Sequence, residues 1–284
     1  MPGRLQSQSY GKHSVRVSKV RRPRVAAANV EHHEFVEASV NIELQGAFDA
    51  AYTAADNTSI IATDTCKNTV YALAKDHSLD TIESFGVTIA EYFLTNFSHV
   101  ENCRITLSEQ VWTRISDSAH AFIANDKATP TATVSCQRGS QPIVQSGVKH
   151  VLIAKTTESG FTNFHESEFR TLADTEDRIL ATDMTAEWTY ASGELEFAAN
   201  RRSIFDALLA KFIDHYSNSV QETLYKMGQS ALDSCSAITE ITLTMPNKHH
   251  LLANLSPFDR ENENEVFVVT DEPFGYITAT IERA

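Results

Sequence analysis

Two pairs of helical segments, each set between segments with strand-like alternation, constrain the fold of this 284-residue chain most strongly. In the first half, apolar residues at helical spacing predict helices over 65–75 and 81–97. In the second half, the same spacing predicts helices over 205–216 and 220–231. The order of strands, a helix pair and strands thus occurs twice, although no repeat is found residue by residue. This pattern predicts an α+β protein.

Strands are predicted where polar and apolar residues alternate, because successive side chains of a strand point to opposite faces of a sheet. The predicted strands cover residues 10–20, 34–46, 103–115, 119–123, 131–136, 151–155, 184–190, 238–245 and 266–281. The stretch 137–147 is the predicted boundary region, because it is polar and contains Gly and Pro. We therefore expect two units, residues 1–140 and residues 141–284.

The charge balance argues against two classes of partner. The formal net charge is −13 at pH 7, whereas binding to phosphates requires clustered Lys and Arg, so neither nucleic acid nor an anionic membrane is expected. An anionic substrate would need a local Arg or Lys. The four cysteines lie far apart without a C-x-x-C pair, so we predict neither a zinc ribbon nor a disulfide framework. Residues 1–24 contain no apolar run, so we expect no secretory signal or membrane span there.

Residues 60–71 carry the most specific local signal. An apolar pair is followed by Thr63 and Asp64, which can both cap a helix, and then by apolar residues at helical spacing. A loop that leads into a helix N-terminus presents free N–H groups and a positive dipole end to an anionic or hydrogen-bonding ligand. The alternative is that Thr63 or Asp64 serves only as an N-cap. Asp80 is predicted to cap the helix over 81–97.

Motifs spread along the chain resemble, in order and in separation, those of the urate oxidase (uricase) family. These motifs are Tyr10-Gly11-Lys12, residues 60–71, Phe161, Arg178, Val220-Gln221 and Pro246-Asn247-Lys248-His249. The resemblance runs from about Tyr10 to the C-terminus. It implies the tunnelling fold (T-fold), in which two tandem units of antiparallel sheet carry helix pairs on the outside and oligomerisation completes a barrel.

The resemblance also implies a homotetramer with active sites at the subunit interfaces. Thr63 and Asp64 would then come from the subunit next to the one that supplies Arg178 and Gln221. A single subunit would hold half of each site.

The resemblance assigns substrate binding to Thr63, Asp64, Phe161, Arg178, Val220, Gln221 and Asn247. The planar fork of Arg178 would hold a carbonyl oxygen and adjacent ring atoms of the urate anion, and Gln221 would bind the other edge. Phe161 would stack on the flat heterocycle. Taken singly, Arg178 could instead pair with neighbouring carboxylates, Gln221 could lie on an exposed helix face, and Phe161 could belong to the core. Leu172 and Ile277 match family positions that pack near the ligand.

Lys12, Thr63 and His249 are the predicted catalytic residues. A shielded lysine amine can pass protons near neutrality, a threonine hydroxyl can relay them, and an imidazole titrates in that range. On the resemblance, Lys12 and Thr63 act as a dyad on the substrate proton and His249 continues the relay. Asn247 would hold dioxygen or water above the ring.

The implied reaction oxidises urate with dioxygen and water to 5-hydroxyisourate and hydrogen peroxide, without a cofactor. The sequence contains no G-x-G-x-x-G, Walker or G-x-S-x-G motif. No metal site is predicted, because neither adjacent pair, His32-His33 or His249-His250, can place both rings on one side of a strand. Two alternatives remain open: another T-fold enzyme for purines or pterins, which could need zinc, and a purine-binding protein without turnover.

The chain departs from the family pattern in two places. After Phe161 the family often reads Arg-Asp-x-Tyr-Thr-Thr-Leu, whereas residues 163–172 read Asn-Phe-His-Glu-Ser-Glu-Phe-Arg-Thr-Leu. The family pattern therefore does not predict the shape of this loop. The short C-terminus ends Ile281-Glu282-Arg283-Ala284, without the Ser-Lys-Leu type of peroxisomal address found in many eukaryotic members. We therefore expect a prokaryotic, cytoplasmic protein.

Overall fold

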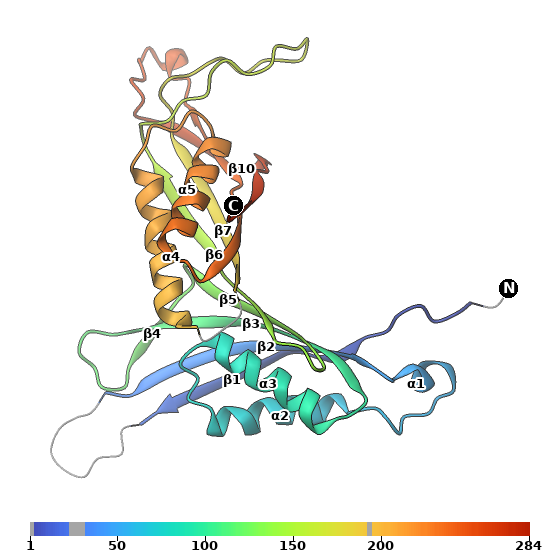
Figure 1. Cartoon of the computed structure of the whole chain (residues 1–284). Coiled ribbons are helices and arrows are strands. Elements are labelled where there is room, and N and C mark those ends of the chain that lie inside the picture. The colour runs from blue at the N-terminus through green and yellow to red at the C-terminus, as the bar shows by residue number, and fades with distance from the viewer. Residues whose placement is uncertain (1–2, 23–31, 192–194) are drawn as a thin grey trace. The chain divides into compact units, whose positions relative to one another are not determined.

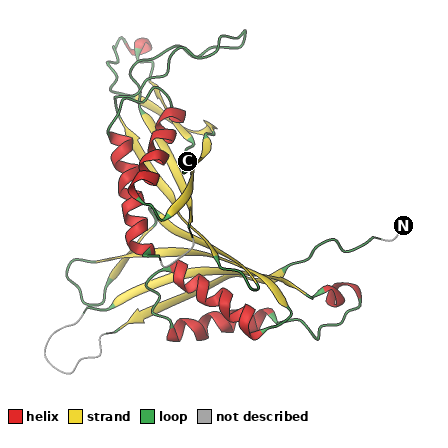
Figure 2. Ribbon diagram, viewed as in Figure 1, coloured by secondary structure: helices red, strands yellow, loops and turns green. Residues whose placement is uncertain are grey.

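The structure is a computed structural model that describes residues 3–22, 32–191 and 195–284 (Figure 1). Antiparallel strands and paired helices make up the chain (Figure 2), which confirms the predicted α+β class. The chain forms two compact units, residues 1–147 with 189–198 and residues 148–188 with 199–284. Among the described helices, none is both long and apolar enough to cross a membrane.

The first unit is an antiparallel sheet covered by a helix pair. Its strands are β1 (Tyr10–Arg21), β2 (Glu34–Gly46), β3 (Val100–Arg114) and β5 (Thr129–Gln137) in that order, and β4 (Phe122–Asn125) pairs with β3. Its helices are α1 (Asp49–Thr53), α2 (Thr63–Asp76) and α3 (Ile82–Asn96). Helices α2 and α3 lie together on one face of the sheet (Figure 1).

Alternation along the strands builds the core of the first unit. Ile42 and Leu44 of β2 are fully buried, and Ile42 lies opposite the equally buried Ile105 of β3. Phe85 and Phe93, two turns apart on α3, are also fully buried and meet this face of the sheet. The apolar side chains that recur every second residue on the strands and every 3.6 residues on the helix therefore pack in the same core.

The second unit repeats this design with an added strand pair. Its main strands are β6 (Ile143–Lys155), β7 (Leu180–Tyr190), β8 (Ile238–Thr244) and β11 (Thr278–Glu282) in that order, and its helices are α4 (Phe197–Ile213) and α5 (Val220–Ser234). The added strands β9 (Asn247–Leu252) and β10 (Phe267–Gly275) pair with each other, β9 also pairs with β7, and a 3₁₀ turn, η1 (Ser256–Phe258), lies between β9 and β10. Met184 and Trp188 of β7 and Leu224 and Met227 of α5 are buried in the core.

Two expectations about helix starts are corrected. Helix α2 begins at Thr63, with Ala62 in the N-cap position and no side-chain cap, so Thr63 and Asp64 are first-turn residues rather than caps. Helix α3 is capped by Thr81, whose side chain accepts from the amide of Ser84, whereas the predicted cap Asp80 is one residue too early. In the predicted boundary stretch 137–147, residues 138–142 connect β5 to β6, and β6 begins at Ile143.

The predictions differ from the structure at strand β9, at the predicted strand 266–281 and at the start of helix α4. Strand β9 was missed because its apolar residues Leu251 and Leu252 are exposed and do not alternate with buried positions. The predicted strand 266–281 is two strands, β10 and β11, which pair with different neighbours. Helix α4 begins at Phe197, several residues before its apolar stripe becomes regular. In each case tertiary pairing decides a boundary that local periodicity does not mark.

Candidate active site

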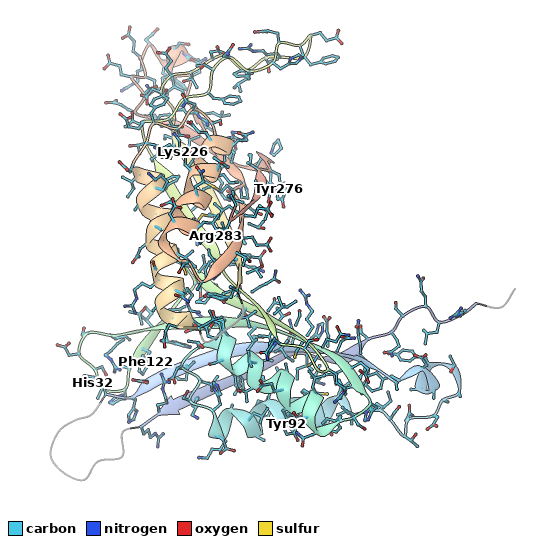
Figure 3. The ribbon with its side chains drawn as sticks, in the orientation of Figure 1. His32, Tyr92, Phe122, Lys226, Tyr276 and Arg283 are labelled. Carbon is cyan, nitrogen blue, oxygen red and sulfur yellow. The ribbon has the colours of Figure 1, made fainter. Side chains whose placement is uncertain are left out.

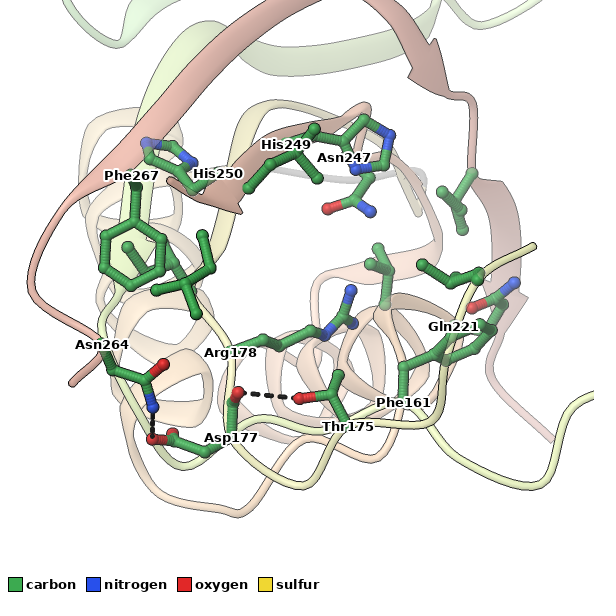
Figure 4. A pocket seen from close by; sticks show the side chains of 16 residues that line it. Phe161, Thr175, Asp177, Arg178, Gln221, Asn247, His249, His250, Asn264 and Phe267 are labelled. Carbon is green, nitrogen blue, oxygen red and sulfur yellow. Dashed lines mark hydrogen bonds between the residues drawn. The ribbon is translucent and has the colours of Figure 1, made fainter. Parts of the chain in front are cut away.

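A cavity of about 400 Å³ opens in the second unit (Figure 4). We call it the Arg178 cavity. Its lining includes most of the predicted substrate-binding residues and one predicted catalytic residue, namely Phe161, Arg178, Val220, Gln221, Asn247 and His249, together with Leu172 and Ile277. Residues from the loop after β6, the start of α5 and strand β9 therefore meet at one place.

Arg178 points into this cavity (Figure 4), and its terminal nitrogens make no hydrogen bond to a described residue. Its Nε donates to the carbonyl oxygen of Gly160 at 3.1 Å, and its amide donates to the carbonyl of Ser159 at 2.9 Å. No carboxylate in the described part of the chain pairs with its guanidinium. The neighbouring Asp177 instead accepts from the Thr157 hydroxyl at 2.9 Å and from the Asn264 amide at 3.4 Å.

The environment of Arg178 favours an anionic ligand. Burial lowers the pKa of Arg178, with a small opposing effect of Tyr216, because desolvation disfavours a charge that has no partner. A ligand anion in the cavity would supply that partner, and two parallel N–H donors would suit a planar acceptor edge. Within the described residues, Arg178 therefore does not form an ion pair with a neighbouring carboxylate, which was the alternative to substrate binding.

Phe161 offers one aromatic face to the cavity. Its backbone pairs with Thr175 through hydrogen bonds of 2.7 and 3.0 Å, which fixes the position of its Cα. Its ring stacks on the ring of Phe164 with centroids 4.6 Å apart and planes 9° apart, and the Arg178 guanidinium lies 5.5 Å from the Phe161 centroid. Phe164 does not line the cavity. One face of Phe161 is thus covered, and the other is available for a flat ligand.

The N-terminus of α5 brings Val220 and Gln221 to the same cavity. The Ser219 hydroxyl accepts from the amide of Glu222 at 3.1 Å, and the Glu222 carboxylate accepts from the amide and side chain of Asn218 at 2.9 and 2.7 Å. This capping box begins the helix at a defined residue. Val220 is buried, whereas the Gln221 side chain is exposed and makes no hydrogen bond to a described residue.

Backbone hydrogen bonds join these pieces into one frame. The amide of Gly160 donates to the carbonyl of Ser217 at 2.8 Å, and the amide of Ser217 donates to the carbonyl of Glu158 at 2.9 Å. The segment that carries Phe161 is therefore bonded on one side to Arg178 and on the other to the loop before α5. Such a frame holds a binding site in place without a ligand.

Strand β9 supplies Asn247 and His249 from the opposite wall (Figure 4). Asn247 lies opposite Thr182 of β7, and His249 lies opposite Thr270 of β10. Two residues apart, they project to the same side of the strand, whereas Lys248 between them contacts Asp271 at 3.1 Å. Neither side chain of the pair has a hydrogen-bond partner among the described residues, so both can bind a ligand or water.

Lys12, Thr63 and Asp64 lie in the first unit and do not line the Arg178 cavity. The hydroxyl of Tyr10 accepts from the amide of Ile61 at 2.8 Å, which ties β1 to the loop before α2. Hydrogen bonds from Lys67 at 2.5 Å and Asn68 at 2.9 Å, with a contribution from the charge of Lys12, lower the pKa of Asp64. The structure thus brings Lys12 near the start of α2.

Thr63, in the exposed first turn of α2, has a hydroxyl without a partner among the described residues. Ala62 is the N-cap and Thr63 the first residue of α2, in the turn where backbone amides have no partner within the helix. The structure therefore places Lys12, Thr63 and Asp64 in one neighbourhood and the remaining predicted site residues in another.

Several cavity residues were not singled out from the sequence: Thr175, Asp177, Ile179, His250, Leu251, Leu252, Asn264 and Phe267. They come from the loop before β7, from β9, from the segment between β9 and β10 that holds Asn264, and from β10, and no periodicity marks them. In residues 3–22, 32–191 and 195–284, no group of three or more His, Cys, Asp or Glu side chains is placed to hold a metal ion.

The fold defines a tandem T-fold protein, and its second unit holds a cavity lined by Phe161, Arg178 and Gln221. The sequence profile of the Uricase family matches residues 8–135 and 144–278. The chain is 39% identical over 279 residues to the uricase of Arthrobacter globiformis, covering 98% of this chain and 90% of that protein. It is 35% identical over 283 residues to the uricase of Danio rerio, covering 96% and 93%. The chain belongs to the uricase family.

Solved structures agree with this assignment. The crystal structure of the Arthrobacter globiformis uricase superimposes with a TM-score of 0.94 at 38% identity, covering 100% of this chain and 96% of that chain. A uricase from Bacillus fastidious, at 22% identity, shares the fold with a TM-score of 0.83 and covers 98% and 94%. The family, the tandem T-fold and the enzyme class predicted from the motifs, an oxidoreductase of the urate oxidase type, are confirmed.

Proposed function

We propose that this chain oxidises urate with dioxygen and water to 5-hydroxyisourate and hydrogen peroxide, without a cofactor. The observation that carries this proposal is the convergence of Arg178, Gln221 and Phe161 on one cavity, with donor and acceptor groups that have no partner in the described protein. Family membership supplies the substrate class. Urate loses two electrons, dioxygen gains them with two protons as hydrogen peroxide, and water supplies the new hydroxyl group at C5.

Substrate binding is proposed to orient and hold the urate anion. The two terminal nitrogens of Arg178 would grip one edge, the amide of Gln221 would donate to and accept from the other, and Phe161 would support the ring from one face. Val220 would pack beside Gln221. Holding the anion rigidly in a shielded cavity places the reacting carbon below Asn247, which would bind dioxygen or water.

Proton transfer is proposed to pass through Lys12, Thr63 and His249. Lys12 and Thr63 would remove a proton from the bound anion and so make it rich enough in electrons to reduce dioxygen. His249, beside Asn247, would pass protons to the forming peroxide and from the attacking water. The free hydroxyl of Thr63 and the unpaired ring of His249 among the described residues support these roles.

We further propose a homotetramer in which Lys12, Thr63 and Asp64 of one copy complete the site around Arg178 of another. This assembly accounts for the separation of the two residue sets between the two units of one chain. The division into T-fold units of residues 1–140 and 141–284, and the cytoplasmic location, also stay predictions. Sedimentation of the purified protein tests the tetramer. If sites are shared, mixing Lys12→Ala with Arg178→Ala subunits would give more activity at low urate than either variant alone.

The decisive experiment follows urate absorbance and oxygen uptake in parallel on protein treated with chelator and dialysed. We expect equal molar loss of urate and oxygen and an equal molar gain of hydrogen peroxide. Turnover that stops on metal removal and returns with zinc would instead support a metal-dependent T-fold enzyme for purines or pterins. Urate binding without oxygen uptake would identify a purine-binding protein, and either result would overturn the proposal.

A further inference from the structure

The loop after Phe161, where this chain departs from the family pattern, contains a stack of side chains that ends at the Arg178 cavity. The Phe161 ring lies on Phe164 with centroids 4.6 Å apart, and the Arg170 guanidinium lies over the other face of Phe164, 4.0 Å from its centroid. Arg170, Phe164 and Phe161 therefore form a column whose last member faces the cavity.

All three nitrogens of the Arg170 guanidinium make contacts that hold the side chain in this column. Its Nε donates to the carbonyl of Leu172 at 3.1 Å, and its two terminal nitrogens form ion pairs with Glu166 and Asp174. Its side chain is 16% exposed, whereas its partner Glu166 is 82% exposed. A long, flexible side chain is ordered in this way at an entropic cost, which packing on Phe164 offsets.

One partner of Arg170 lines the cavity, and another is next to a lining residue in the sequence. Leu172 lines the cavity, and Asp174 accepts from the amide of Asn163 at 3.1 Å and directly precedes Thr175, which pairs with Phe161. Arg170 thus connects both ends of the loop that leaves and returns to Phe161. Two carboxylates flank its single positive charge, so Arg170 with its partners presents no net positive charge to a bound anion.

We propose that Arg170 is a positioning residue for the bound ring, acting through Phe164 on Phe161. Removing Arg170 frees Phe164 to leave the stack, and Phe161 then loses the support that holds its open face toward the ligand. Aromatic stacking and cation–π contacts each contribute modestly, so the expected loss in ligand affinity is roughly three- to tenfold. This inference rests on the proposed function for the identity of the ring, and on the stack alone for the role of Arg170.

The test compares Arg170→Ala, Phe164→Ala, Phe164→Tyr and the double variant by urate turnover and by urate binding under nitrogen. We expect KM and the anaerobic Kd to rise roughly three- to tenfold in Arg170→Ala and Phe164→Ala, with kcat within about twofold of wild type. Phe164→Tyr keeps the stacking face and should stay within about twofold of wild type. The double variant should bind no more weakly than Phe164→Ala, because both changes act through one stack.

A matched control removes the same kind of contact elsewhere. Arg114 lies over the ring of Phe122 at 4.9 Å, in the first unit, so Arg114→Ala should leave Kd unchanged. Unchanged Kd in Arg170→Ala and Phe164→Ala, with unfolding midpoints like that of wild type, would overturn the proposal, as would equal weakening by Arg114→Ala. Full additivity in the double variant would overturn the route through Phe164.

Amide hydrogen exchange separates this proposal from the proposed function. Exchange at Phe161 and Thr175 should accelerate in Arg170→Ala and Phe164→Ala but not in Arg114→Ala, whether or not urate binds. If the wild-type protein neither binds nor oxidises urate, the function proposed above fails while this measurement still decides the role of Arg170. Unchanged exchange at both amides would refute the positioning role.

Discussion

The starts of helices α5 and α2 are built in different ways. At α5, Ser219 and Glu222 form a capping box with Asn218, and Val220 is buried in the core. At α2, the N-cap position is Ala62, no side chain caps the helix, and the first turn is exposed. Both helix starts carry predicted site residues, but one start is tied to the protein and the other is open.

This difference matches two roles in the proposed mechanism. The start of α5 orients the ligand, and the start of α2 completes a site in another copy. A residue that orients a ligand must be held before the ligand arrives, and the frame around α5 provides such support. A residue that completes a site in another copy must instead lie at an accessible surface with free groups, as Thr63 does at the start of α2. The variants below test whether the first set governs binding and the second governs turnover.

The largest effect is expected from Lys12→Ala. Loss of a general acid–base group should lower kcat by roughly 10²- to 10⁴-fold with little change in KM, because binding contacts around Arg178 remain. Steady-state kinetics with urate checks this, and His13→Ala, an exposed neighbour on β1, is the control with unchanged kcat. A rise in KM alone would show that Lys12 binds substrate. That result would contradict the proposal that the first-unit residues govern turnover and the Arg178 cavity governs binding.

Arg178→Ala should act in the opposite way. Arg178 is half-buried. Truncating a partly desolvated, charged hydrogen-bonding group costs roughly 2–5 kcal/mol of binding, so KM should rise by at least about thirtyfold. Arg178→Lys keeps the charge but loses the planar fork and should recover only part of the affinity. An anaerobic urate titration measures this directly, and unchanged affinity in Arg178→Ala would remove Arg178 from the site.

Gly160→Ala tests the frame that joins the two sides of the Arg178 cavity. A Cβ at this position would collide with the Tyr216 hydroxyl and lie 2.9 Å from the carbonyl of Thr175. We expect a loss of about 1–3 kcal/mol in unfolding free energy and a higher KM, as the frame shifts. Adding Tyr216→Phe should recover part of both losses. If it recovers neither, the collision with the hydroxyl is not their cause.

The sequence predicted the fold to the extent that periodicity and pairing agree. Helix α3 and strand β2 carry regular apolar patterns, and their observed bounds differ from the predicted ones by at most one residue. Strand β9 could not be predicted, because it has an exposed apolar end and is defined by its pairing with β7 and β10. The start of α2 was misplaced because Thr63 and Asp64 have the chemistry of caps but not their position.

The motifs pointed to six residues that line the Arg178 cavity, namely Phe161, Arg178, Val220, Gln221, Asn247 and His249, whereas local physics did not predict their contacts. Arg178 among carboxylates suggests an ion pair, and only the fold shows that Asp177 is engaged by Thr157 and Asn264 instead. Phe164 and Arg170 lie in a loop without periodicity, so no sequence pattern indicates that they stack behind Phe161. Contacts between residues distant in sequence, which depend on the whole fold, decide both cases.

The smallest effect concerns the acidic residues in the first turns of the two helices. Hydrogen bonds from Lys226 and Asn218 lower the pKa of Glu222 from 4.5 to about 2. A carboxylate with a lowered folded-state pKa stabilises the protein above its unfolded value, and this contribution is lost as pH falls from 4.5 toward 2. Glu222→Gln should therefore cost about 1 kcal/mol in unfolding free energy near neutrality, with the difference from wild type shrinking below pH 4.5.

Urea unfolding of wild type and Glu222→Gln at several pH values between 7 and 3 measures this dependence, and Asp64→Asn provides the comparison at α2. The Asp64 side chain is 69% exposed, and the hydrogen bonds that it accepts come from side chains of its own helix. Its loss should therefore change the unfolding free energy by less than the loss of Glu222. A pH-independent cost in Glu222→Gln would show that the carboxylate charge is not what caps α5. Equal costs in the two variants would show that the two helix starts do not differ in how firmly they are held.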